Sequence, residues 1–231
     1  MNSREDQISA VAALDEPTRR RLYNYVLRQS EPVSRDDAAM ALGLPRSTVG
    51  FHLDRLVEQR LLDSGYQRLT GRSGPGAGRP AKLYSRSSHQ VTVSMPPRCY
   101  ELAGQLLSNA LAHAERSKQS PRAILNERAY EMGKALGETA RSATGSHNNT
   151  LKAALRLLED NGFQPRIEDN DVILGNCPFH TLAQDHKELI CGMNLRLLNG
   201  VVDGLAPDEL TAQLRGTPTQ CCVRLAYAAE G

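Results

Sequence analysis

The chain has 231 residues, of which 40% are hydrophobic and 23% are charged, and its formal net charge is +2. It contains no run of eighteen apolar residues and no basic leader followed by an apolar stretch, which argues against a membrane-spanning helix and predicts an unprocessed cytoplasmic protein. The hydrophobic content suffices for ordinary cores, and the length favours two small domains.

The charge is divided unevenly along the chain. Residues 1–100 carry 15 Lys and Arg against 10 Asp and Glu, whereas residues 101–231 carry 13 against 16. Between Arg60 and Arg98 there are seven basic residues and a single acid, Asp63. Such a concentration of positive charge favours a polyanionic partner, nucleic acid in particular, although a solvated basic loop has the same composition.

Two short helices are predicted near the start of the chain. Asp15 can cap the first, Pro17 fits its first turn, and the helix should end near Ser30. The segment Ser34–Asp37 resembles a capping box that begins the second helix. Gly43 is a typical helix stop, so the second helix is short.

A third helix is predicted from about Arg46 to Arg60. One face carries three apolar residues that we expect in the core, and the opposite face presents hydroxyls, an aromatic ring and a cation, which is suited to reading base edges in a major groove. The expected core residues are Val49, Leu53 and Leu56, and the expected base-reading residues are Ser47, Thr48, Phe51 and Arg55. Arg46 and His52 complete the predicted DNA-contacting set of this helix, with His52 suited to packing or a phosphate contact.

Two segments of alternating residues follow, Tyr66–Thr70 and Ala81–Ser85. They predict a β-hairpin around a glycine-rich basic tip. Three basic side chains are expected to grip phosphates or enter a minor groove there: Arg72, Arg79 and Lys82.

The stretch from Leu14 to Ser85 resembles the ArsR-type winged helix-turn-helix repressors. The motifs that carry the resemblance are Pro45-Arg46-Ser47-Thr48-Val49-Gly50-Phe51-His52-Leu53-Asp54-Arg55-Leu56 and, in the wing, Gly78-Arg79-Pro80-Ala81-Lys82-Leu83-Tyr84. The resemblance implies double-stranded DNA as the partner. A winged-helix module that binds proteins is the alternative.

Two longer helices are predicted at residues 98–118 and 122–141. The first carries a stripe of apolar and small residues, and the second carries another: Ala103, Leu106, Leu107, Ala110, Leu111 and Ala114, then Ile124, Leu125, Ala129, Met132, Leu136 and Ala140. A winged-helix reader gains affinity by placing two recognition helices on a palindromic operator, so these stripes are a candidate homodimer interface. Packing within one chain is the alternative.

Residues 142–149 are polar and typical of a turn, which predicts a boundary. We therefore expect an α+β chain in three parts: a winged helix-turn-helix at 1–97, a central helical dimerisation segment at 98–149 and an α+β sensor domain at 150–231. The last part is predicted to contain a helix at 151–161, strands at 163–168 and 171–174, a helix at about 181–200, a short helix, and a strand at 221–226.

Four of the five cysteines lie in this last part: Cys177, Cys191, Cys221 and Cys222. Thiolates drawn from a loop, a helix and a strand can converge on one metal or cluster. Because adjacent strand residues point to opposite faces, we expect only one of Cys221 and Cys222 to be a ligand unless the strand is irregular there. His180 is the nearest candidate for a fourth ligand and His186 the next, while small buried cysteines without a ligand are the alternative.

The whole arrangement resembles the iron–sulfur-assembly (suf operon) repressor family, through Asn176-Cys177-Pro178-Phe179-His180 and Cys191-Gly192-Met193-Asn194-Leu195. The resemblance implies a homodimeric repressor controlled by a [4Fe-4S] cluster. Zinc suits a Cys₃His site equally well. Two further hypotheses are a regulator that senses an organic ligand and, in another class, an enzyme with Cys177 as nucleophile and His180 as base. We expect no enzymatic activity.

Overall fold

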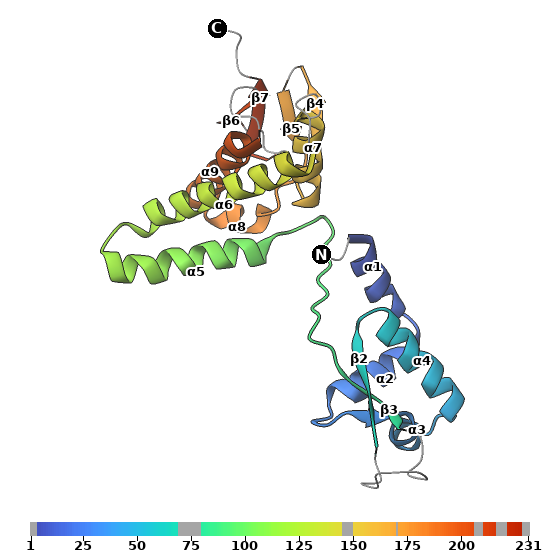
Figure 1. The fold of residues 1–231 in the computed structure, drawn as a ribbon. Helices are drawn as coiled ribbons and strands as arrows, with labels where there is room; N and C mark the ends of the chain where they lie inside the picture. The colour runs from blue at the N-terminus through green and yellow to red at the C-terminus, as the bar shows by residue number, and fades with distance from the viewer. Residues whose placement is uncertain are drawn as a thin grey trace. The chain divides into compact units, whose positions relative to one another are not determined.

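The computed structural model describes residues 4–68, 80–144, 150–169, 171–205, 210–215 and 221–227 (Figure 1). The chain is mixed helix and strand, and it divides into two units, Met1–Val93 and Ser94–Gly231. None of the helices within the described ranges is both long and apolar enough to span a membrane.

The first unit begins with four helices: α1 (Arg4–Ala13), α2 (Pro17–Leu27), α3 (Arg35–Leu42) and α4 (Arg46–Glu58). Helix α1 was not predicted from the sequence. Glu16, not Asp15, caps α2, because its carboxylate accepts hydrogen bonds from the backbone N–H groups of Thr18 and Arg19. The predicted capping box is confirmed, with Ser34 and Asp37 bonding reciprocally at the start of α3.

A glycine turn separates α3 from α4. Gly43 has a φ of 65°, a left-handed conformation that glycine adopts without steric cost, and its N–H donates to the carbonyl of Ala39. The prediction that Gly43 ends the second helix is therefore confirmed. Pro45 then begins α4, whose axis can take a new direction after this short turn.

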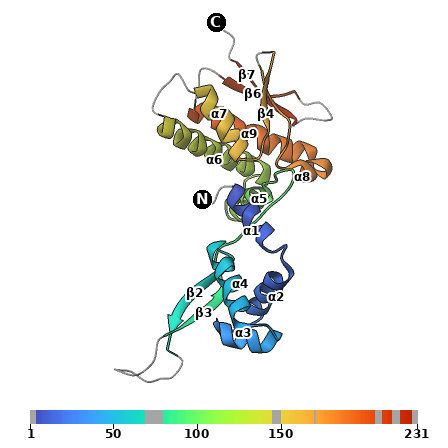
Figure 2. The ribbon, with the colours of Figure 1, turned by 90° about the vertical axis from the view of Figure 1, so that its right-hand side faces the viewer.

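Three antiparallel strands complete the first unit in the order β1-β3-β2: β1 (Val33–Ser34), β2 (Leu62–Gln67) and β3 (Ala81–Arg86). The hairpin was predicted correctly, but β2 begins four residues earlier than expected because Leu62 is a core residue with 1% exposure. Figure 2 shows β2 and β3 beside α4. The expected core of α4 is confirmed, since Val49, Leu53 and Leu56 are fully buried.

The described residues of the second unit form five helices and a four-stranded antiparallel sheet: α5 (Tyr100–Ser117), α6 (Pro121–Thr144), α7 (Thr150–Asp160), β4 (Pro165–Glu168), β5 (Asp171–Leu174), α8 (His180–Asp185), α9 (Lys187–Leu205), β6 (Leu210–Leu214) and β7 (Val223–Tyr227). The strand order is β4-β5-β7-β6. The helix predicted at 181–200 is two helices that meet at His186. The short helix predicted before the last strand is instead β6, because its backbone pairs with β7.

Glycines allow α6 and α9 to approach each other closely. A Cβ atom placed on Gly133 would lie 1.9 Å from the carbonyl oxygen of Leu197, and one on Gly200 would lie 2.0 Å from that of Tyr130. The same holds for Gly137 and Gly204, one turn further along each helix. The backbones of the two helices are therefore in direct contact.

A single core joins α5 and α6 to the segments after residue 150, where the sequence suggested separate parts. Of the predicted α5 stripe, Ala103, Leu106 and Ala110 are buried within the chain itself, while Leu111 is 58% exposed. Packing within one chain therefore accounts for most of this stripe. Dimerisation through this region stays a prediction.

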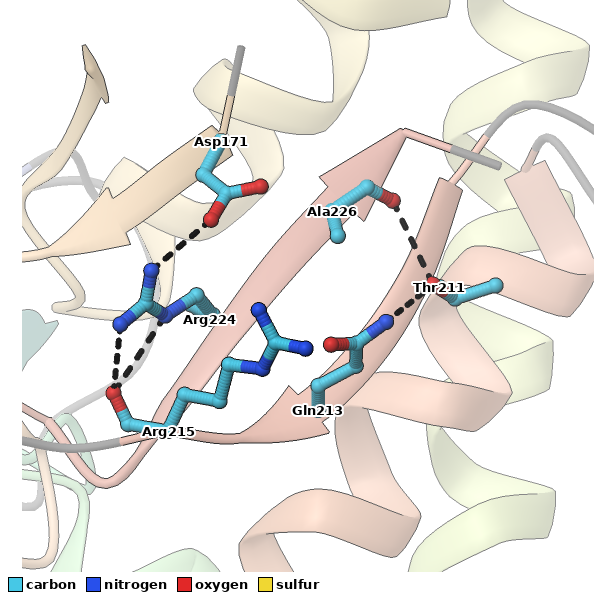
Figure 3. A network of polar contacts seen from close by, with 6 residues as sticks. All are labelled: Asp171, Thr211, Gln213, Arg215, Arg224 and Ala226. Atoms are coloured by element: carbon cyan, nitrogen blue, oxygen red, sulfur yellow. Dashed lines mark hydrogen bonds and ion pairs between the residues drawn. The ribbon is translucent and has the colours of Figure 1, made fainter. Parts of the chain in front are cut away.

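Polar side chains brace the sheet of the second unit (Figure 3). The Arg224 guanidinium lies 2.9 Å from the Asp171 carboxylate and donates to the carbonyl oxygen of Arg215 at 3.0 Å, so it links β5, β7 and the end of β6. On β6, Thr211 donates to the carbonyl of Ala226 and accepts from Gln213. These bonds fix β7, the strand that follows the Cys221-Cys222 pair.

Candidate functional site

Four cysteines come together in the second unit. Cys177 lies in the loop after β5, Cys191 in the first turns of α9, and Cys221 and Cys222 directly before β7. The thiols of Cys177 and Cys222 are near enough to that of Cys221 to shift its pKa, and the Cys222 thiol acts on that of Cys191 in the same way. We call these four residues the cysteine group.

Both members of the Cys221-Cys222 pair belong to this group. The strand in which the pair was expected begins only at Val223, and the pair lies in a bend before it, so the condition of an irregular strand is met. The alternation of a strand does not apply there. The backbone N–H of Cys221 donates to the carbonyl of Leu174 at 3.0 Å, which holds the bend against the end of β5.

The surroundings of the thiols favour their neutral form. The hydrogen bond to Cys221 and then burial raise the pKa of Cys177, and burial raises the pKa of Cys191. The pKa of Cys221 rises to about 11: its hydrogen bond with Cys177 lowers it, but the bond to Cys222 and burial outweigh that effect. In the absence of a bound cation, these three side chains are therefore uncharged at neutral pH.

His180 does not join the cysteine group. Its side chain is exposed at the start of α8, and its contact with the Cys177 loop is through the backbone, where its N–H donates to the carbonyl of Cys177 at 3.1 Å. His186, the second candidate, is exposed between α8 and α9. Within the described ranges, no three Cys, His, Asp or Glu side chains are arranged as a ready-made site for a single metal ion.

A buried asparagine fixes the loop that carries Cys177. Asn176 is 7% exposed; it accepts a hydrogen bond from Arg98 at 2.6 Å and donates to the carbonyls of Pro97 and Gly162 at 2.9 and 2.6 Å. The N–H of Cys99 also donates to the carbonyl of Pro178 at 3.1 Å. Residues 97–99, at the beginning of the second unit, are thus bonded to both sides of Cys177.

A second asparagine, Asn194 on α9, touches the cysteine group directly. It is fully buried, and its side-chain N–H donates to the Cys221 sulfur at 3.3 Å. Sequence reasoning missed both asparagines as site residues. The signal available was their position beside Cys177 and one turn after Cys191, within the motifs that had been singled out.

An apolar cavity in the second unit is too small for an organic ligand. Its volume is about 10 Å³ and its lining includes Leu102, Leu136, Phe163, Phe179 and Val201. That volume holds about one water molecule, whereas sites for small organic molecules typically measure some 300–1,000 Å³. This cavity therefore offers no room for the organic effector considered from the sequence.

In the first unit, α4 presents the predicted outward face. Ser47 and Arg55 are exposed, Thr48 is half-buried, and the apolar Phe51 side chain is 65% exposed. Pro45 caps the helix without a side-chain hydrogen bond, so the partial positive charge of the helix N-terminus is open to an anion. An exposed ring beside hydroxyls and cations can contact a thymine methyl and the phosphates around it.

Two of the predicted DNA-contacting arginines form surface ion pairs. Arg46 bonds to Asp36 and Arg55 to Glu58, the latter at 2.8 Å. The side chains of Arg46 and Arg55 keep 63% and 48% of their surface exposed. Exposed pairs of this kind are weak, so both guanidinium groups can exchange a carboxylate for a phosphate at small cost.

His52 and Lys82 are engaged within the first unit. The His52 side chain is 11% exposed and its Nδ1 lies 3.5 Å from the Glu16 carboxylate, so it packs between α4 and the start of α2. Lys82 lies 2.6 Å from the Asp54 carboxylate, and the hydroxyl of Tyr84 donates to the same oxygen at 2.8 Å. Lys82, expected to grip phosphate, ties β3 to α4 in this structure.

Asp54 is the residue that sequence reasoning missed in this unit. Burial alone would raise the pKa of Asp54. The hydrogen bonds from Lys82 and Tyr84 lower this pKa by more than burial raises it, so the net shift is downward. Lys82 and Tyr84 are two residues apart on β3 and so share one face of the strand. A lysine and a tyrosine two residues apart on one face of a predicted strand were the sequence pattern that could have indicated an acidic partner.

These helices and their tight turn match a known family model. Residues 14–64 match a helix-turn-helix domain. The matched residues include α2, α3, α4 and the start of β2. In domains of this type, the helix that follows the turn lies in the major groove of DNA, and α4 is the helix at that position. No curated protein and no solved structure matches the chain.

The wing that follows the helix-turn-helix domain is described only in its strands. Arg72 and Arg79, the predicted phosphate-gripping residues of its tip, lie outside the described residues. Their roles stay predictions, as does base reading by Ser47, Thr48, Phe51 and Arg55.

Proposed function

We propose that this protein is a cytoplasmic, homodimeric transcriptional repressor whose binding to a palindromic operator is controlled by a [4Fe-4S] cluster on Cys177, Cys191, Cys221 and Cys222. The observation that carries the proposal is the meeting of four thiols from three separate segments in a chain that also has a helix-turn-helix domain. Five free cysteines suit a reducing compartment.

The DNA-binding half of the proposal rests on α4. Its buried face is occupied by core residues, so the exposed face is the part available to a groove. Phe51 and the hydroxyls of Ser47 and Thr48 supply contacts to base edges, while Arg46 and Arg55 supply charge for the phosphates. Most of the affinity should come from the phosphates and should fall with salt concentration.

The regulatory half rests on the donor set of the cysteine group. Thiolates are the usual ligands of iron–sulfur clusters and of zinc, and a bound cation would allow these thiols to ionise. A cluster held here would supply sensitivity to oxidants and to iron supply. Ligation requires the four side chains to turn toward a common centre.

The Asn176 bonds provide a route from the cysteine group toward the helix-turn-helix domain. Asn176 and Arg98 hold the Cys177 loop to residues 97–99, and the chain continues from there into the first unit. A change in the position of Cys177 would therefore act on the segment that joins the two units. This connection is the physical basis on which we assign control of DNA binding to the cysteine group.

Zinc is the second candidate for the same residues. Zinc takes four thiolates in a tetrahedral arrangement, and the thiols of Cys177 and Cys221 are near enough to shift one another's pKa values. A cysteine-dependent enzyme is a weaker candidate. The thiolate is the nucleophilic form, and the raised pKa of Cys177 disfavours it.

The test uses the full chain purified without oxygen. We expect bound iron and sulfide, visible absorbance, and selective binding to DNA fragments that the protein itself enriches from a random-sequence pool. Removing the cluster with a chelator should change the affinity for those fragments about tenfold or more, in line with ordinary allosteric couplings. Cys191→Ser should lose the iron, and Cys99→Ser, at the cysteine outside the group, should keep it.

Three outcomes would contradict parts of the proposal. A colourless protein that takes up no iron during anaerobic reconstitution excludes the cluster, and stoichiometric zinc in that protein establishes the zinc form instead. A failure of every form to select DNA excludes the regulator. A mass of one chain for the DNA-binding form excludes the homodimer.

A further inference from the structure

Asn194 is an unusual residue for its position. It lies in the middle of α9 with no exposed surface, surrounded by the apolar core of the second unit. A buried amide without hydrogen-bond partners costs about 1–3 kcal/mol of stability. An apolar side chain at this place would not carry that cost.

The Asn194 side chain forms a hydrogen bond through its amide nitrogen. The side-chain N–H of Asn194 donates to the Cys221 sulfur at 3.3 Å, within the range of a hydrogen bond to sulfur. The Oδ1 atom is buried and has no hydrogen-bond partner among the described residues. The bond to sulfur is thus the interaction that distinguishes asparagine from an apolar residue here.

Asn194 lies close to two of the candidate ligands, Cys191 and Cys221. It follows Cys191 by three residues on α9, so the two side chains lie on neighbouring positions of one helix face. Asn194 reaches the Cys221 sulfur, while the N–H of Cys221 bonds to the carbonyl of Leu174 on the other side. Cys221 is therefore held at its backbone and at its sulfur, between α9 and the end of β5.

We propose that Asn194 is a positioning residue of the cysteine group, whose N–H bond to sulfur holds Cys221 in place as a metal ligand and stabilises its thiolate. The inference rests on the proposed function and deepens it. N–H donors to ligand sulfurs offset the negative charge that the sulfur gains when it binds a metal. The side chain therefore lowers stability in the metal-free protein and strengthens binding in the loaded one.

The experiment compares metal binding by the wild type and Asn194→Leu, which removes the donor and keeps the number and branching of the side-chain heavy atoms. Metal-free full-length protein is titrated with Co²⁺ alone under anaerobic conditions, and the sulfur-to-cobalt absorption reports the thiolates bound. We expect Asn194→Leu to bind Co²⁺ about 10–100-fold more weakly, with a shifted absorption band, as is usual when a partner of a ligand is removed. The metal-free variant should unfold at the same temperature as the wild type or a higher one.

Asn161→Leu is the matched control, because the side-chain N–H of Asn161 donates to the carbonyl of Leu157 and not to a cysteine sulfur, and its backbone bond with the Cys99 thiol is kept in the variant. It should leave Co²⁺ affinity and the absorption band unchanged. If Asn194→Leu fails to fold, Asn194→Ala removes the same donor without added bulk and decides the question.

The outcomes separate this inference from the proposed function. A wild type that binds neither Co²⁺ nor iron overturns both the metal site and the role of Asn194. A wild type that binds Co²⁺ while Asn194→Leu binds it equally tightly, with the same spectrum, overturns the positioning role alone. Failure to bind DNA bears on the regulator and leaves the Asn194 result standing.

Discussion

The apolar residues of α4 differ in exposure: some are buried in the core, whereas Phe51 is exposed. Its ring is 65% exposed, whereas Val49 and Leu53, two residues away on either side, are fully buried. Exposure of a large aromatic ring on a helix that otherwise buries its apolar residues indicates a contact outside the chain. The helical periodicity of the sequence was enough to distinguish the two faces.

Replacing Phe51 with alanine should therefore weaken DNA binding with little effect on stability. Burying an exposed phenylalanine against a partner contributes about 1.5–3 kcal/mol, so we expect a loss of about tenfold or more in affinity for the selected DNA fragments. Fluorescence anisotropy with labelled DNA measures this. Val11→Ala, at an exposed apolar residue of α1, serves as the control; equal affinities for the two variants would place the DNA elsewhere.

Lys82 shows the limit of reading single residues. A lysine in a basic segment predicted a phosphate contact, but its ammonium group bonds to Asp54 on another element. Charge counts along the sequence do not reveal which cations are already paired. That pairing depends on the crossing of β3 and α4, which brings residues 28 positions apart together.

At the scale of elements, the contact between α6 and α9 depends on glycine. The Cβ positions at Gly133 and Gly200 are occupied by backbone atoms of the facing helix. Neither helix could have been paired with the other from hydrophobic periodicity, because the residues that matter carry no side chain. A small-residue spacing of four in both helices was the signal available.

Gly200→Ala should destabilise the second unit strongly. The added methyl would lie 2.0 Å from the Tyr130 carbonyl oxygen, so the helices must separate, at a cost of about 3 kcal/mol or more. Thermal unfolding followed by circular dichroism measures the change. Gly104→Ala is the matched control: a Cβ there meets nothing within 4 Å, and the gain in helix propensity should stabilise α5 by about 0.5–1 kcal/mol. Equal melting temperatures for the two variants would disprove the close packing.

At the scale of the whole molecule, the open question is how two chains would associate. Burial of Ala103, Leu106 and Ala110 within the chain leaves Leu111, at 58% exposure, as the large apolar residue of the predicted α5 stripe that faces outward. A homodimer formed through α5 would have to use this outer face. An isologous interface would place the stripe against its own copy.

If the proposed homodimer forms through α5, Leu111→Glu should convert it to single chains, because two buried carboxylates would face each other across the axis. Sedimentation velocity on the full chain measures the mass. Leu214→Glu, at an exposed leucine of β6, should leave the dimer intact. A dimer that survives Leu111→Glu would exclude α5 as the interface.

The sequence alone determined those features whose causes are local. The ends of α3 follow from Ser34, Asp37 and Gly43, and the buried face of α4 follows from a spacing of three and four residues, so both could be predicted without knowing the rest of the chain. The tertiary structure decided the features whose causes are distant in sequence. It placed Cys221 and Cys222 in a bend, made β6 a strand by pairing it with β7, and brought Asn194 to a sulfur 27 residues away. Strand pairing and contacts between distant side chains arise only when separate segments meet, and no local pattern encodes which segments will meet.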